Sequence, residues 1–376
     1  MQCLNFLDFE PNSSLATEWQ QLENLLKLQN MNKVTIKNSG HSFDVRPSQT
    51  VLQAAIEAGI NLPYGCRNGA CGSCKAKLLS GKVMHNDYQG SAMTDAELAA
   101  GNTLLCCAMA LDDLVIECRE VGGLAGIKPR ILPARLAKKE WLAHDVIALH
   151  LQLPASERLQ FLAGQYIEFI LKDGKRRAFS IANAPHDSDF LQLHIRVLKG
   201  GAFSEFAANE LQEKAILRLE APFGNFFLRE NSDKPVIFVA GGTGFAPVKG
   251  IIEHMLHQQN KDSHIKRDII LYRGARQLQD LYMHELCEKW AELMPNVSYI
   301  PVLSEPATSD NWQGRTGLVH QAVLDDHKNL NGYQAYVCGA PGMCEVAHTS
   351  FVQQGLLADE FFSDAFTFAM KWLRLI

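Results

Sequence analysis

The stretch YGCRNGACGSCKAKL, residues 64–78, places three cysteines at Cys66, Cys71 and Cys74 with glycines between them. Cysteines this close together are compatible with disulfide bonds, with a zinc site or with an iron–sulfur cluster. The N-terminal sequence carries Asp8 and Glu10 where a signal peptide would be positively charged. A cytoplasmic location is therefore expected, and in that reducing compartment ten cysteines favour metal binding or catalysis over disulfides.

The spacing of the three cysteines, four residues and then two, is that of a plant-type 2Fe-2S cluster, which needs a distant fourth cysteine. A zinc site would need a second CxxC pair or a Cys/His pattern, and no second CxxC is present. The segment TLLCCA, residues 103–108, offers both Cys106 and Cys107. It resembles the plant-type ferredoxin signature, in which the ligand directly follows the apolar pair, and the resemblance implies Cys106.

Composition limits the class of protein. The chain has 376 residues, of which 47% are hydrophobic and 20% are charged, as in folded multidomain proteins. A net charge of −5 gives no basic field for nucleic acid, so no nucleic-acid partner is expected. The longest apolar runs, such as residues 103–111, are too short to span a membrane.

The rhythm of apolar residues changes along the chain and indicates four parts. Residues 1–32 are expected to be an N-terminal extension, with a short amphipathic helix at 15–28 and Met31 as an alternative start. Residues 33–122 contain the closely spaced cysteines described above. A Gly- and Pro-rich linker is expected at 122–133. Period-two alternation within 123–230 predicts an antiparallel barrel, whereas strands alternating with helices in 231–376 predict a parallel α/β sheet.

Individual elements are predicted from the same patterns. A hairpin is expected around residues 38–40, helices at 51–58 and from 94, and strands at 75–79 and 114–118. Barrel strands are expected at 146–153, 165–171, 190–198 and 215–220. In the last part we expect strands at 235–240, 268–274, 297–303 and 334–340, and helices at 249–259, at 281–293 and after 340.

Two short motifs in the second part suggest a flavin. Arg177-Ala178-Phe179-Ser180 ends a strand, and GGAFS at 200–204 combines a glycine turn with a hydroxyl that could bind phosphate. Together with PFGNF at 222–226, this order resembles the flavin-binding barrel of the ferredoxin-NADP reductase superfamily. The resemblance implies that Arg177 pairs with the flavin pyrophosphate, Phe179 stacks on the ring system and Ser180 lies near its reactive N5 atom. Gly201 and Ser204 would form the second phosphate element, which favours FAD over FMN.

The third part carries a glycine-rich turn, Gly241-Gly242-Thr243-Gly244-Phe245-Ala246-Pro247, between a strand and a helix. Pro247 stands where the dinucleotide fingerprint has its third glycine, and the loop resembles instead the GGTGxAP loop of the same superfamily. The segment with Cys338 and Gly339 resembles the superfamily's CGxPxM motif, in which the cysteine lies beside the nicotinamide. FFSDAF, residues 361–366, resembles the terminal aromatic element near the flavin. The resemblance implies coenzyme or flavin contacts for Phe362 and Phe366 and a hydride site with Ser180, Cys338 and Asp364.

Residues 34–370 thus resemble three-part reductases such as the phenol, methane and benzoate oxygenase reductases and CDP-6-deoxy-glucoseen reductase. The family implies a β-grasp 2Fe-2S ferredoxin domain, an antiparallel β-barrel that binds FAD and a parallel-sheet NAD(P) domain. Electrons would pass from NAD(P)H through FAD and the cluster to a redox partner protein, an oxygenase, hydroxylase or deoxysugar dehydrase. The alternative is an electron-relay subunit without its own coenzyme site. The acidic run LDDLVIECRE, residues 111–120, could face the partner, but a solvated strand end is favoured.

NADH is favoured over NADPH as the coenzyme. Arg273 and Arg276 follow the second strand of the nucleotide domain, where cationic groups usually bind a 2′-phosphate. In the reductases that this chain resembles, however, an Arg at the second position accompanies NADH use. Arg276 would then contact the ribose or a diphosphate oxygen, or pair with Asp280.

Overall fold

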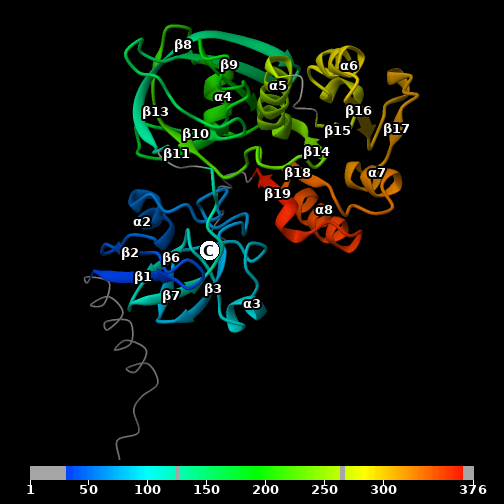
Figure 1. Ribbon diagram of the computed structural model, residues 1–376. Helices are drawn as coiled ribbons and strands as arrows, with labels where there is room; N and C mark the ends of the chain where they lie inside the picture. The colour runs from blue at the N-terminus through cyan, green and yellow to red at the C-terminus, as the bar shows by residue number, and fades with distance from the viewer. Residues whose placement is uncertain (1–30, 124–126, 263–266, 367–376) are drawn as a thin grey trace, which may run out of the picture. The chain divides into compact units, whose positions relative to one another are not determined.

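The computed structural model describes residues 31–123, 127–262 and 267–366, and the chain divides into two compact units between Gly122 and Gly123 (Figure 1). The expectations for residues 1–30 and for the tail beyond Phe366 lie outside the described residues. None of the described helices is long and apolar enough to cross a membrane.

The first unit is built on a five-stranded mixed sheet. Its strands and helices are β1 (Asn32–Ile36), β2 (Ser42–Val45), α2 (Val51–Ala58), β3 (Lys75–Ser80), β4 (Val83–His85), α3 (Asp95–Ala99), β5 (Asn102–Leu104), β6 (Ala108–Ala110) and β7 (Leu114–Glu117). The order is β2-β1-β7-β3-β5, with β1 and β7 parallel at the centre, and β4 pairs separately with β6. This is the expected β-grasp arrangement, which confirms the predicted fold of this unit.

Helix α2 shows why the local sequence folds as predicted. The Thr50 side chain accepts a hydrogen bond from the amide of Gln53 and caps the helix start. Gly59 ends the helix in the left-handed conformation at φ 77°. The helix buries Val51 and Leu52, and the cysteine loop follows it directly.

The second unit begins with an antiparallel barrel. Its elements are β8 (Arg130–Ala143), β9 (Val146–Gln152), β10 (Tyr166–Ile170), β11 (Arg176–Ser180), β12 (Leu191–Arg196), α4 (Ala202–Asn209) and β13 (Ile216–Phe223). The order is β11-β10-β13-β8-β9-β12, and a bridge between Ile181 and Leu193 joins the two edges of the sheet. The predicted barrel is therefore confirmed.

Strand β8 corrects the predicted linker, which was expected to extend over residues 122–133. The strand begins at Arg130, and Leu132 and Ala134 already contribute to the barrel core. Its pairing with β9 is interrupted by irregularities between Leu136 and Lys138 and between Trp141 and Ala143. These interruptions affect only the part of the strand after Leu136. Before it, the buried side chains of Leu132, Ala134 and Leu136 alternate with exposed ones, and the linker prediction rests on the glycines and prolines of this segment.

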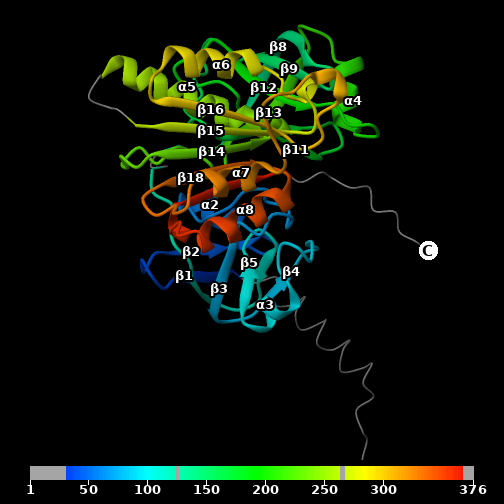
Figure 2. The same ribbon diagram turned by 90° about the vertical axis from the view of Figure 1, so that its right-hand side faces the viewer.

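The rest of the second unit is a six-stranded parallel sheet. Its strands and helices are β14 (Val236–Gly241), α5 (Phe245–Lys261), β15 (Ile269–Ala275), α6 (His284–Leu293), β16 (Val297–Leu303), β17 (Arg315–Thr316), α7 (Val319–Asp326), β18 (Gln334–Gly339), α8 (Pro341–Gln353) and β19 (Phe361–Ala365). The order is β17-β16-β15-β14-β18-β19. Helices α5 and α6 cover one face and α7 and α8 cover the other (Figure 2), so the sheet is doubly wound as predicted.

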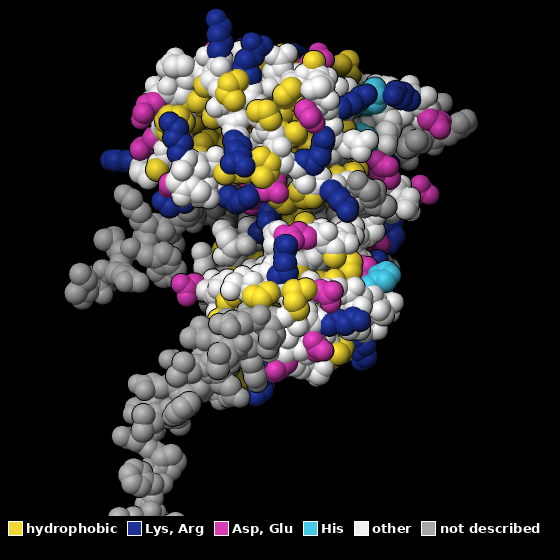
Figure 3. Space-filling model, turned by 90° about the vertical axis from the view of Figure 1, so that its left-hand side faces the viewer, with side chains coloured by type: hydrophobic (Ala, Val, Ile, Leu, Met, Phe, Trp, Pro, Cys, Tyr) yellow, Lys and Arg dark blue, Asp and Glu magenta, His cyan; other side chains and the backbone are white. Residues whose placement is uncertain are grey.

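The surface carries charges of both signs. On the face shown in Figure 3, Lys and Arg side chains are interspersed with Asp and Glu side chains and with apolar ones.

Candidate functional site

The four cysteines predicted as metal ligands lie in two pairs within the first unit. The Cys66 and Cys71 thiols interact with each other, and so do those of Cys74 and Cys106. The backbone of the loop also contributes, because the Cys66 amide donates to Cys71 Sγ at 3.4 Å and the Ala70 amide donates to Cys66 Sγ at 3.3 Å. Amide groups directed at sulfur stabilise a thiolate and, equally, a cluster ligand.

The pKa values of two of these cysteine thiols are lowered, which favours metal binding. Hydrogen bonds from the thiols of Cys107 and Cys74 lower the pKa of Cys106 to about 4. In the other pair, the hydrogen bond from the Cys66 thiol lowers the pKa of Cys71 to about 6. In each pair the neighbouring thiol thus favours the thiolate form of one cysteine, and the thiolate is the form that binds metal.

Two pairs of cysteines fit a two-iron cluster better than a single metal ion. Within the described residues, no group of three or more His, Cys, Asp or Glu side chains is placed to hold one metal ion. A zinc ion would need four ligands around one point. A 2Fe-2S cluster needs two sulfurs on each of two irons, and the pairs Cys66–Cys71 and Cys74–Cys106 would supply them.

Glycines in the loop allow the close packing that surrounds these pairs. Gly72 has φ +76°, and a Cβ atom there would lie 2.8 Å from the carbonyl oxygen of Ala92. Gly69 has φ +74°, and a Cβ atom there would lie 2.7 Å from Cys107 Sγ. A larger residue at either position would push the loop away from the cysteines.

Strand β11 carries the residues predicted to contact the flavin. The Arg177 side chain is partly exposed, and its Nη1 donates to the Arg176 carbonyl at 2.8 Å. Ser180 is buried at the end of the strand, where it pairs with Tyr166 of β10. The strand thus holds the guanidinium of Arg177 toward solvent and the hydroxyl of Ser180 within the protein.

The Phe179 ring is anchored in an aromatic cluster inside the barrel. Its centroid lies 5.8 Å from that of Phe169 and 5.2 Å from that of Phe203, which is in the first turn of α4. The ring is only partly buried, so part of its surface remains accessible. Phe179 therefore connects the two predicted flavin elements.

The glycine turn before α4 is closed by its own hydroxyl group. Ser204 Oγ accepts a hydrogen bond from the Leu198 amide at 3.1 Å and donates to the Gly201 carbonyl at 3.0 Å. Gly201 is the N-cap residue of α4. Ser204, predicted to contact the pyrophosphate, thus holds the shape of the turn from which α4 begins.

The two predicted coenzyme loops pack against each other at the carboxyl ends of β14 and β18. A Cβ atom at Gly244 would collide with the Cys338 carbonyl oxygen, and one at Gly241 would lie 3.0 Å from Met343 Sδ. A Cβ atom at Gly339, which has φ +155°, would lie 2.7 Å from Met343 Cε. The glycines are therefore required by the contact between the loops as well as by any ligand.

Helix α5 starts directly after the glycine loop. Gly242, Thr243 and Gly244 form a single 3-10 turn, and Pro247 is buried in the first turn of α5, where its missing amide hydrogen costs nothing. The N-terminus of α5 thus lies at the carboxyl edge of the parallel sheet, which is where such sheets bind nucleotides.

Cys338 and Asp364 lie on neighbouring strands. Cys338 of β18 is in register with Ala240 of β14 on one side and with Asp364 of β19 on the other. Cys338 is 0% exposed and Asp364 is 8% exposed. Burial, and to a smaller extent the charge of Asp364, raises the pKa of the Cys338 thiol well above its ordinary value, so the thiol is neutral.

The two phenylalanines of the terminal element have different surroundings. The Phe362 ring stacks on Tyr336 at 4.7 Å between centroids, and the Arg229 guanidinium lies 4.5 Å from it. The Phe366 amide donates to the Gly339 carbonyl at 2.8 Å, next to Cys338. Phe362 is thus held by protein contacts, whereas Phe366 is the aromatic residue at the junction of the coenzyme loops.

Arg273, which lies in β15, and Arg276, which follows it, have different surroundings. Arg276 is exposed, but Asp280 accepts instead from the Gln277 amide at 3.1 Å, so the predicted Arg276–Asp280 pair is not formed among the described residues. Arg273 is 1% exposed, lies 3.8 Å from the Phe245 ring and donates to the Tyr282 carbonyl at 2.7 Å. The suggestion that Arg273 could bind a 2′-phosphate is therefore wrong.

Arg196 is a residue that the sequence analysis missed. It ends β12 in the barrel, and its Nη1 would lie 3.0 Å from a Cβ atom at Gly242 in the coenzyme loop. Its Nε lies 3.0 Å from Asp145 Oδ2. No local motif marks this position, because Arg196 and Gly242 meet only when the barrel and the parallel sheet pack together.

The acidic side chains of residues 111–120 pair with other residues of the first unit. Asp113 accepts a hydrogen bond from the Lys33 amide at 2.7 Å, and Glu117 pairs with Lys37 at 3.4 Å. Glu120 lies 2.9 Å from His41 Nδ1. These pairs support the favoured interpretation of a strand end over that of a partner surface.

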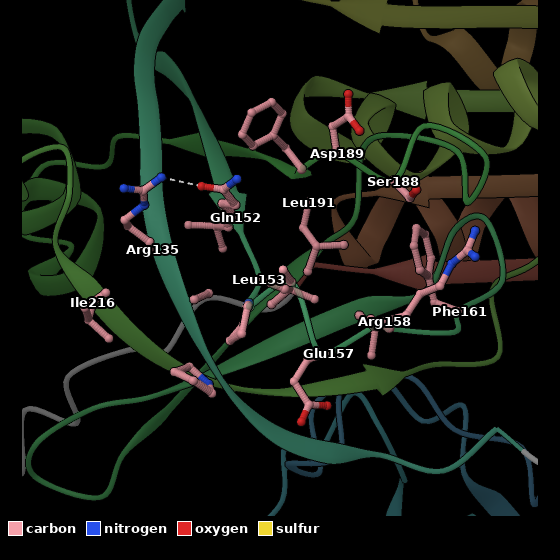
Figure 4. Close-up of a pocket in the computed structure, with 17 residues that line it drawn as sticks. Arg135, Gln152, Leu153, Glu157, Arg158, Phe161, Ser188, Asp189, Leu191 and Ile216 are labelled. Atoms are coloured by element: carbon pink, nitrogen blue, oxygen red, sulfur yellow. Dashed lines mark hydrogen bonds between the residues drawn. The ribbon is translucent and has the colours of Figure 1, made fainter.

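A cavity of about 670 Å³ lies elsewhere on the barrel (Figure 4). Arg135 and Gln152 are hydrogen-bonded on one side of it, and Arg158 and Phe161 line the other. None of the residues predicted to contact a cofactor lines this cavity.

Comparison with protein families identifies three domains in this chain. Residues 34–111 match the 2Fe-2S iron-sulfur cluster binding domain, residues 133–228 the oxidoreductase FAD-binding domain and residues 238–349 the oxidoreductase NAD-binding domain. The alternative of a relay subunit without a coenzyme site is therefore wrong.

Curated relatives match over most of the chain. CDP-6-deoxy-L-threo-D-glycero-4-hexulose-3-dehydrase reductase of Yersinia pestis is 38% identical over 333 residues, which are 89% of this chain and 98% of that protein. Reductase component 2 of terephthalate 1,2-dioxygenase from Comamonas sp. is 35% identical over 338 residues, 89% of this chain and 97% of that protein.

Among solved structures, the Amycolatopsis cytochrome P450 reductase GcoB has a TM-score of 0.75 and 29% identity, over 90% of this chain and all of that one. The ferredoxin reductase of carbazole 1,9a-dioxygenase, at 23% identity and a TM-score of 0.66, shares the fold over 90% of this chain and 99% of its own. With domains for FAD, NAD and a 2Fe-2S cluster in one chain, this protein belongs to the family of NAD(P)H-dependent iron–sulfur flavoprotein reductases within the ferredoxin-NADP reductase superfamily.

Proposed function

We propose that the protein oxidises NADH and delivers the electrons one at a time, through FAD and then the 2Fe-2S cluster, to a deoxysugar dehydrase. The observation that carries the order of electron flow is the position of Cys338, which is packed on the glycine loop that starts α5. The proposed coenzyme site and the flavin motifs therefore belong to the same unit, whereas the four cysteines belong to the other unit. Electrons from the coenzyme would reach the flavin first and the cluster second.

The chemistry explains why the modules are combined. A nicotinamide donates two electrons as a hydride, and a 2Fe-2S cluster accepts one electron at a time. Bound FAD accepts the hydride at N5 and releases electrons singly, which connects the two processes. The protein supplies binding and orientation for each group.

The roles of individual residues are part of the proposal. Arg177 and the turn that begins α4 bind the FAD diphosphate, because a guanidinium donates to phosphate oxygens in two directions. Ser180 hydrogen-bonds near the reactive nitrogen of the flavin, and Phe179 stacks on the flavin ring system. The neutral thiol of Cys338 and the carboxyl group of Asp364 border the hydride site. The backbone of Gly241–Gly244 receives the coenzyme diphosphate, and Arg276 contacts its ribose.

We also propose domain limits and a location. Residues 33–122 form the ferredoxin domain, 123–230 the FAD domain and 231–376 the NAD domain, with 1–32 as an extension. The division of the described chain between Gly122 and Gly123 supports the first limit. All nine described cysteines are free thiols, which supports a cytoplasmic location.

The electron acceptor is the most specific element of the proposal. A dehydrase of CDP-6-deoxyhexulose type is favoured because the relatives that serve one are 38% identical to this chain. An oxygenase is the second candidate, since oxygenase reductases reach 34–35% identity over a similar length. Stopped-flow reoxidation of the NADH-reduced protein by each purified acceptor separates the two. Faster reoxidation by the oxygenase component would contradict the dehydrase assignment.

The coenzyme preference is tested by dye reduction with NADH and NADPH. Because Arg273 is buried, Arg276 is the only one of the two arginines exposed to coenzyme. We expect a higher kcat/KM with NADH. A preference for NADPH of about tenfold or more, 1.4 kcal/mol of transition-state binding, would reverse the assignment.

A further inference from the structure

A fifth cysteine, Cys107, lies against one of the four proposed cluster ligands. Its sulfur is 3.6 Å from Cys106 Sγ, and the residue is 2% exposed. Consecutive side chains of a strand point to opposite faces. Here, however, the Cys107 amide donates to the Leu104 carbonyl at 2.9 Å, so both cysteines sit in a turn between β5 and β6. The turn brings the two sulfurs to the same side.

The position of the Cys107 sulfur is fixed by its surroundings. The Cys107 carbonyl accepts a hydrogen bond from the Asn86 amide at 2.9 Å. The thiol lies 3.7 Å from the Asp87 carbonyl oxygen, and the missing side chain of Gly69 makes room for it. Among the described residues, the hydrogen-bond partners of the buried thiol are the Asp87 carbonyl and the Cys106 sulfur.

We propose that Cys107 acts as a positioning residue whose thiol donates a hydrogen bond to the Cys106 sulfur and thereby raises the reduction potential of the cluster. The proposal rests on Cys106 being a ligand, as in the proposed function. A ligand sulfur carries negative charge and is a stronger acceptor than a neutral carbonyl at a similar distance. On reduction the cluster gains one electron, the charge on the ligand sulfurs increases and the thiol keeps its proton. The hydrogen bond therefore stabilises the reduced state more than the oxidised state.

The experiment is a redox titration of the full-length holoprotein, followed by paramagnetic resonance of the reduced cluster. Cys107→Ala removes the donor, and Cys107→Ser keeps a donor on a shorter side chain. Cys118→Ala is the matched control, because it removes a half-buried thiol of the same unit that lies beyond β7. Iron content and thermal stability are measured for every variant.

We expect Cys107→Ala to retain its iron and to make cluster reduction about three- to tenfold less favourable, tenfold being 59 mV for a one-electron couple. Cys107→Ser should show a smaller shift, and Cys118→Ala none. An unchanged potential in Cys107→Ala would overturn the proposal. Loss of iron from both Cys107 variants would also overturn it, since Cys107 would then be a ligand or an essential packing residue. A wild-type protein without a 2Fe-2S cluster would instead contradict the proposed function.

Discussion

Cys338 of β18 stands directly beside Asp364 of β19 in the register of the parallel sheet. Both side chains are almost completely buried, and both lie one residue before the end of their strands. The strand ends of such a sheet are where nucleotides bind. The sheet register therefore brings a neutral thiol and a carboxyl group together at the edge proposed for hydride transfer.

Cys338→Ala is expected to slow flavin reduction by NADH by about tenfold or more, because the thiol borders the proposed hydride site. Coenzyme affinity and flavin content should change little. Single-turnover stopped-flow measurement at several NADH concentrations separates rate from affinity. Cys287→Ala, which removes another fully buried thiol on α6, is the control. Equal rates in the two variants would remove Cys338 from the site.

The rate of flavin reduction is expected to show no decrease from Cys338 ionisation between neutral and mildly alkaline pH. The pKa of this thiol is raised, mainly by burial and also by Asp364, so the proton is lost only when the pH rises through that raised value. A pH profile of the single-turnover rate, compared with that of Cys338→Ala, tests this. An alkaline inflection present in the wild type and absent in the variant would show that the thiol titrates near its ordinary pKa.

Gly244→Ala is expected to raise the KM for NADH about tenfold or more, since the added Cβ would collide with the Cys338 carbonyl and separate the two coenzyme loops. The backbone at Gly244 has φ −58°, which alanine adopts easily, so strain is not the cause. Gly342→Ala is the control, because a Cβ there meets no atom within 4 Å. Similar KM values for both variants would contradict the packing argument.

Cys106→Ser is expected to lose or distort the cluster, whereas Cys107→Ser should keep it. Cys106 is the residue paired with Cys74, and Cys107 lies behind it. Iron analysis and paramagnetic resonance of the reduced variants provide the measurement. A normal signal from Cys106→Ser would exchange the two assignments.

Cys71→Ser is expected to leave flavin reduction by NADH intact and to abolish reduction of a one-electron protein acceptor such as cytochrome c. The reason is that the two units act in series in the proposed function. Flavin reduction and acceptor reduction are followed in the same stopped-flow experiment. If a fully flavinated variant reduced its flavin slowly, electron entry would depend on the cluster and the series order would be wrong.

Much of the fold could be predicted because most strands keep a regular pattern. Strand β16 occupies residues 297–303 as expected, since its flanking segments are clearly polar. Strand β8 was missed in its first part because the glycines and prolines of residues 122–133 favour a linker, although Leu132, Ala134 and Leu136 alternate with exposed residues. Helix α7 was missed as well, because it has neither a side-chain cap at its start nor a glycine at its end, whereas α2, of the same length, has Thr50 and Gly59.

The 2Fe-2S cofactor was predictable because one short motif indicates it, and the family match over residues 34–111 agrees. The motif is the spacing of Cys66, Cys71 and Cys74 along the chain. Arg273 and Arg276 look equivalent in the sequence, yet one belongs to the core and the other to the surface, because strand alternation ends between them. Arg196 could not be predicted from the sequence, because its contact with Gly242 joins segments that are far apart in the chain.

The order of strands in the parallel sheet has a consequence for synthesis of the protein on the ribosome. Strand β14, which leads into the coenzyme loop, borders β18, and β18 borders β19, more than a hundred residues after β14. The first unit, by contrast, has all its strands once residue 117 has emerged. Because domains fold as units during translation, the cysteines can acquire iron while the coenzyme site is still incomplete. Newly made chains therefore become competent to hold a cluster before they become competent to reduce it.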